Sequence, residues 1–82
     1  MFDIEFSKNA EKQLYKLDHN VQERIIAALE RIRIRPYPHV RKLVSCPYFR
    51  LRVGKYRLIL DIEKNKLLIY VIEIGHRKDI YK

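Results

Sequence analysis

Three arginines stand close together in this chain, and their spacing suits the binding of an anion. From residue 49 to residue 53, apolar residues alternate with Arg50 and Arg52. Alternation with a period of two predicts a half-buried strand with both arginines on its polar face. Gly54 and Lys55 then predict a tight reversal, because glycine reaches backbone angles closed to other residues. Arg57 follows at the start of the next apolar run, so a hairpin would gather the three guanidinium groups on one surface.

Clustered guanidinium groups can stabilise the negative charge that develops when a phosphodiester is cleaved. Cleavage of RNA by its own 2′-hydroxyl concentrates charge on the phosphate oxygens, and fixed arginines offset that charge without a metal. The three hairpin arginines and Arg77 could serve this role. A base must take the 2′ proton and an acid must supply the leaving 5′-oxygen. Tyr81 and His76 could serve in this proton transfer.

A plainer interpretation stands beside this one, because an arginine on an exposed strand is usually only a solvated surface residue.

The sequence lacks the residues that other classes of reaction need. The single cysteine, Cys46, has no neighbour that would activate it. The three histidines show no metal-ligand spacing, and two glycines cannot build a phosphate-binding loop. Residue types and spacing alone therefore lead to an anion-binding domain that needs no metal or cofactor.

The positive charge is concentrated in the middle of the chain. The formal net charge is +8, and nine of the 18 basic residues but none of the ten acidic ones lie between residues 31 and 60. A surface that served only solubility would mix the two signs. The middle third is therefore predicted to bind nucleic acid or an acidic protein.

The length of 82 residues predicts one domain covering residues 1–82. The opening residues do not form a secretory signal, and no apolar run approaches the roughly 20 residues of a membrane-spanning helix. One cysteine excludes an internal disulfide and suits a reducing compartment. We therefore expect a cytoplasmic protein with no membrane partner.

The first half of the chain predicts a strand and two helices. Apolar residues alternate from residue 2 to residue 6. Ser7 is placed to cap a first helix, and Asn20 followed by Glu23 has the form of a capping box for a second. Pro36 and Pro38 end the second helix, because proline removes a backbone donor.

The second half predicts three strands. A basic loop from Tyr37 to Cys46 leads into the arginine hairpin. A long strand then runs from Lys66 to Gly75, and its apolar residues on both faces make it a central strand; the tail after it leaves the sheet. The order β-α-α-β-β-β predicts an α+β fold with two N-terminal helices packed on one face of a mostly antiparallel sheet. The other face is left for the arginines.

Taken together, these segments resemble the RelE/ParE toxin superfamily, and its RelE-like branch in particular. The resemblance covers nearly the whole chain. It rests on the residues from Phe6 to Ala10, from Phe49 to Arg57, from Leu67 to Ile74 and from Gly75 to Tyr81. It implies a toxin of a type II toxin–antitoxin system, an mRNA interferase that enters the ribosomal A site and leaves a 2′,3′-cyclic phosphate and a 5′-hydroxyl.

The resemblance also implies roles for individual residues. Arg57 and Arg77 would hold the scissile phosphate, and Tyr81 would stack on the nucleotide. Arg50 and Arg52 stand where some bacterial relatives carry lysines, and arginine is a poor general base because it stays protonated. The base could thus be Tyr81, His76 or a ribosomal group. Contacts to RNA phosphates are expected from Arg33, Arg35, Arg41, Lys42, Lys55 and His76.

The expected partners follow from the same resemblance. They are the ribosome with its mRNA, and an acidic RelB-like antitoxin that forms a hetero-oligomer with the toxin. Two alternatives remain open at this point. One is a ParE-like inhibitor of DNA gyrase, and the other is a non-catalytic RNA-binding relative that has lost cleavage along with the lysines.

Overall fold

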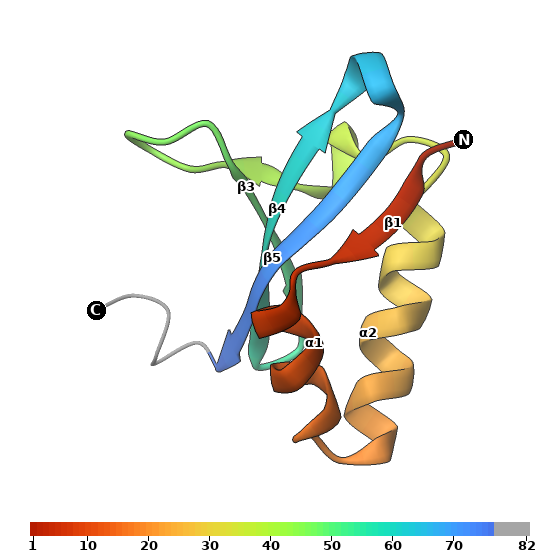
Figure 1. Ribbon diagram of the computed structural model, residues 1–82, viewed down its shortest axis with the longest axis vertical. Coiled ribbons are helices and arrows are strands. Elements are labelled where there is room, and N and C mark those ends of the chain that lie inside the picture. Colours follow the sequence, from red (N-terminus) through yellow and green to blue (C-terminus); the bar gives the residue numbers. More distant parts are fainter. Residues whose placement is uncertain (77–82) are drawn as a thin grey trace.

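The structure is a computed structural model that describes residues 1–76 (Figure 1). Two helices and a five-stranded sheet make up this part of the chain. The elements in chain order are β1 Asp3–Phe6, α1 Lys8–Tyr15, α2 His19–Ile32, β2 Arg41–Lys42, β3 Phe49–Val53, β4 Tyr56–Glu63 and β5 Leu68–His76. Short 3₁₀ turns, η1 Tyr37–His39 and η2 Lys64–Lys66, precede β2 and β5.

The sheet has the strand order β1-β5-β4-β3-β2. Within residues 1–76, β1 runs parallel to its neighbour β5, and the other neighbouring pairs are antiparallel. β5 lies between β1 and β4 and is therefore an inner strand, as predicted. The predicted α+β fold with a mostly antiparallel sheet is confirmed.

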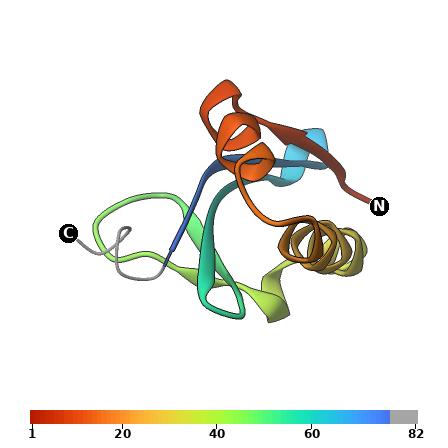
Figure 2. The same cartoon turned by 90° about the horizontal axis from the view of Figure 1, so that it is seen from below.

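Both helices pack on one face of the sheet, α1 against β5 and β1, and α2 against β3. Figure 2 shows α2 on one side of the strands and the loop between β2 and β3 on the other. The core forms between helices and sheet, where α2 contributes Ile25, Leu29 and Ile32. No helix of the part of the chain that the structure describes packs on the opposite face of the sheet, which we call the open face.

Three predicted boundaries were wrong. α2 begins at His19 with Asp18 as its N-cap residue, not at Asn20. The helix therefore begins before the predicted capping box. Glu23 does not form that box, and its Oε1 lies 2.7 Å from Nε2 of His19. The segment predicted as a loop contains β2, whose two residues are too few to show alternation. β5 begins at Leu68 rather than Lys66 and continues through His76, so His76, predicted to lie in the tail outside the sheet, is part of the strand.

Ser7 caps α1, as predicted, and also joins the helix to the sheet. Its Oγ accepts a hydrogen bond from the backbone N–H of Ala10 at 2.9 Å and donates one to the carbonyl oxygen of Ile72 at 2.7 Å. A hydroxyl that satisfies a helix-end amide contributes about 0.5–2 kcal/mol.

Replacing Ser7 with alanine should therefore lower the free energy of unfolding by about 1–2 kcal/mol. Asp18→Ala is the matched control, because the Asp18 side chain makes no capping hydrogen bond and loses only its charge interaction with the helix end, below about 1 kcal/mol. Urea unfolding of both variants measures the difference. Equal losses would show that the Ser7 hydroxyl adds nothing to stability.

Within residues 1–76, no helix is long and apolar enough to cross a membrane.

Candidate anion site on the open sheet face

Strand register brings the arginines of the middle third together. Arg52 of β3 pairs directly with Arg57 of β4, and Arg41 of β2 pairs with Arg50 of β3. Residues directly opposite each other in an antiparallel ladder point to the same side of the sheet. All four side chains therefore project from the open face, away from the helices.

These arginines line one cavity of about 360 Å³, together with His39. We call it the cationic cavity; its lining residues are His39, Arg41, Arg50, Arg52 and Arg57. The side chains differ in depth. Arg52 and Arg41 are exposed and Arg50 is half-buried, whereas Arg57 is only 7% exposed. The three hairpin arginines thus share one face of the sheet, as predicted, but Arg57 is buried within it rather than exposed like Arg52.

The arrangement concentrates like charge. Two cross-strand pairs place arginine opposite arginine, which destabilises a sheet. Within residues 1–76, Arg41 and Arg52 form no ion pair that would offset the repulsion. Converging guanidinium groups match the oxygens of a phosphate, which can accept paired hydrogen bonds from them. A cavity lined in this way can bind a phosphate-like anion.

The hairpin that carries Arg52 and Arg57 depends on Gly54. Its φ of 59° lies in the left-handed region, which glycine adopts without strain. A Cβ at this position would also stand 3.0 Å from Nη2 of Arg24 on α2. Lys55, expected to contact RNA, occupies the same turn and is exposed at one end of the open face.

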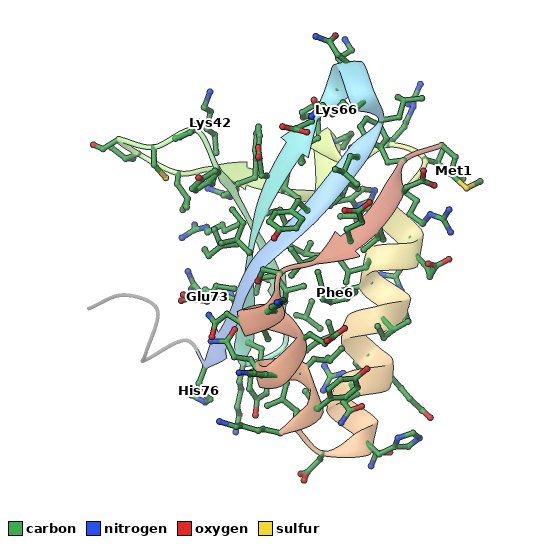
Figure 3. All side chains as sticks on the ribbon, in the orientation of Figure 1. Met1, Phe6, Lys42, Lys66, Glu73 and His76 are labelled. Carbon is green, nitrogen blue, oxygen red and sulfur yellow. The ribbon has the colours of Figure 1, made fainter. Side chains whose placement is uncertain are left out.

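Other residues expected to contact RNA lie outside the cavity. Lys42 pairs with Phe49, on the opposite side of β2 from Arg41, and its Nζ lies 5.9 Å from the centre of the Phe49 ring. Figure 3 shows Lys42 pointing away from Glu73 on β5. Arg35 is exposed just after α2. Both can extend a basic surface, but neither lines the cationic cavity.

Arg33 has a structural role that its residue type did not reveal. Its Nε donates a hydrogen bond of 2.8 Å to the carbonyl oxygen of Phe2, and its Nη1 lies 3.0 Å from the Glu30 carboxylate. Asp3 lies 3.9 Å from Nη2. These contacts tie the end of α2 to the start of β1, so the Arg33 guanidinium is already engaged within the protein.

His76 lies on the helix side of the sheet. It pairs with Tyr56, and the two rings meet edge to face with centroids 5.6 Å apart. The residue on the open face at this point is Gly75, opposite Arg57. His76 and the cationic cavity are therefore on different faces. Arg77 and Tyr81 lie outside the described residues.

A comparison with protein families shows to which family this chain belongs. The family described as ParE toxin of the type II toxin–antitoxin system parDE matches residues 4–81. The chain belongs to this family of the RelE/ParE superfamily. The predicted resemblance is confirmed, and the protein is a RelE-like toxin of type II toxin–antitoxin systems.

Individual relatives of this toxin are distant in sequence but similar in structure. The mRNA interferase toxin RelE of Escherichia coli K12 is 29% identical over 79 residues, which are 92% of this chain and 82% of the relative. A chain in the intact E. coli RelBE toxin–antitoxin complex superimposes with a TM-score of 0.79 at 26% identity, covering 93% of this chain and 96% of the other. The Mycobacterium tuberculosis RelBE2 complex gives 0.85 at 22% identity, covering 93% and 98%.

Removing one charge from the cationic cavity should stabilise the free toxin. Arg52→Gln should raise the free energy of unfolding by about 0.2–1 kcal/mol at low salt, because it relieves the pair with Arg57. Salt screens such repulsion, so the gain should shrink near 1 M NaCl. Arg35→Gln is the control, since Arg35 has no arginine opposite it. A gain of the same size at both salt concentrations would contradict the repulsion.

Proposed function

We propose that this toxin is a ribosome-dependent mRNA endoribonuclease that inhibits translation. The observation that supports it is the cationic cavity, where arginines from β2, β3 and β4 converge and could bind a phosphate group. Relatives at 29% identity are named mRNA interferases, which agrees with this chemistry. The arginines would bind the scissile phosphate and stabilise the charge that accumulates on it.

A second hollow beside the cationic cavity favours a nucleotide over a simple phosphate. It has a volume of about 760 Å³ and shares Arg41 and Arg50 with the cavity. Tyr48 of the β2–β3 loop, Ile59 and Ile72 contribute to its largely apolar lining. Apolar and aromatic surfaces next to a phosphate site can hold the unstacked base of single-stranded RNA. We infer that the scissile phosphate and a neighbouring base occupy these two hollows.

An acidic RelB-like antitoxin is the proposed protein partner. The related E. coli chain was crystallised with its antitoxin in the RelBE complex. An acidic segment laid on the open face would neutralise the paired arginines and keep the toxin from RNA. Toxin and antitoxin would then form a hetero-oligomer in which the nuclease is inactive.

Mapping the 5′ ends of a translated mRNA tests the proposal. Purified toxin added to a translation reaction should produce new ends inside codons, with a 5′-hydroxyl on one fragment and a 2′,3′-cyclic phosphate on the other. The same mRNA without ribosomes should stay intact. Translation arrest without new ends would refute the nuclease.

Inhibition of DNA gyrase is the second candidate, because the family that matches the chain is that of ParE toxins. A supercoiling assay with purified gyrase and purified toxin separates the two. Loss of supercoiling together with intact mRNA would support the gyrase inhibitor.

A further inference from the structure

His39 lies among the arginines of the cationic cavity, although its sequence context did not single it out. It ends η1 and precedes β2, with Val40 between them in an extended conformation, φ −122° and ψ 163°. In an extended backbone, residues two apart point to the same side. His39 and Arg41 therefore project together from the open face, while Val40 packs against the core.

The strand register places His39 at the end of a row of functional groups. β2 pairs with β3 so that Arg41 is opposite Arg50; continued by two residues, this register puts His39 opposite Arg52. Arg52 is opposite Arg57, and Arg57 is opposite Gly75 of β5. One row, which starts at the end of η1 and crosses β3, β4 and β5, thus carries an imidazole, two guanidinium groups and a glycine that leaves space above the sheet.

Among the described residues that line the cationic cavity, His39 has the one side chain whose residue type can serve as a general base. Arginine stays protonated in proteins and cannot act as a general base. An imidazole can gain and lose a proton between pH 5 and 8. Among residues 1–76, the charged groups that line the cavity with His39 are Arg41 on β2, Arg50 and Arg52 on β3, and Arg57 on β4.

We propose that His39 is a catalytic residue of this toxin, the general base that takes the proton from the RNA 2′-hydroxyl; this rests on the nuclease function proposed above. The 2′-oxygen then forms a bond to phosphorus as the bond from phosphorus to the 5′-oxygen breaks. The leaving 5′-oxygen takes a proton from water. Arg52 and Arg57 hold the phosphate oxygens in the same row, so base and phosphate are presented together.

The three histidines of the chain supply a matched experiment. Cleavage on ribosomes is measured from pH 5.5 to 8 for the wild type, His39→Gln, His76→Gln and His19→Gln. His39→Gln should slow cleavage about 10²–10⁴-fold, the usual contribution of a general base, and should remove the rise in rate with pH. His19→Gln should match the wild type, because His19 lies at the start of α2 with Glu23.

Rescue separates a chemical role from a structural one. Free imidazole should restore part of the activity of His39→Ala and should not affect Arg57→Ala, which lacks a phosphate-binding group. A His39→Gln enzyme that keeps the wild-type rate and pH profile overturns the inference while the nuclease function stands. So does loss of the pH dependence in His76→Gln alone. A wild type that never cuts mRNA overturns both proposals.

Discussion

Replacing Arg57 with glutamine should slow mRNA cleavage on ribosomes about 10²–10³-fold, the cost of removing one preorganised donor from a developing anion. Arg57 should have the largest effect among the cavity arginines because it is 7% exposed. Electrostatic interactions are stronger where water is excluded. Arg52 and Arg41 are exposed, so water weakens their interaction with the phosphate. Replacing either of them should therefore slow cleavage less.

Arg57→Lys tests whether geometry matters as well as charge. Lysine keeps the positive charge but loses the planar fork that binds two phosphate oxygens at once, so it should recover only part of the lost rate. Arg31→Gln is the control, because Arg31 is an exposed arginine on α2 and its change removes the same charge from outside the cavity. Rates come from the appearance of cut fragments over time, with circular dichroism to verify folding. Near-normal cutting by Arg57→Gln would remove this residue from the mechanism.

The largest effect on stability should come from Leu58→Ala, at about 2–5 kcal/mol. Leu58 is 0% exposed and lies on the inner strand β4, paired with Leu51 on one side and Ile74 on the other. Truncation leaves a cavity between sheet and helices that the strands on both sides cannot close. Small proteins have only about 5–15 kcal/mol of total stability, so much of the variant should unfold at moderate temperature.

Val44→Ala is the control for this change, since it also removes side-chain carbons from an aliphatic residue. Val44 is 91% exposed in the β2–β3 loop, and its replacement should alter stability by less than about 0.5 kcal/mol. Urea unfolding gives both values. Similar losses for the two variants would mean that the core is not centred on β4.

Local patterns in the sequence were sufficient for the elements that depend on near neighbours. Alternation around Arg50 and Arg52 predicted β3, Gly54 predicted the turn, and Ser7 predicted the start of α1, because each signal acts within a few residues. The predicted start of α2 was two residues late. Several polar residues near Asp18 can cap the start of a helix, and local preference does not distinguish among them. β2 was missed because two residues carry no periodic signal.

The sequence by itself determined that arginines would gather on one face of a sheet, because a strand's period of two and a glycine turn depend only on neighbouring residues. Only the tertiary structure decided that Arg57 is buried, that Arg33 is engaged at the end of α2, and that His39 rather than His76 faces the arginines. These outcomes depend on which strand lies beside which and in what register. Pairing between distant segments is set by packing of the whole core, and no short stretch of sequence contains it.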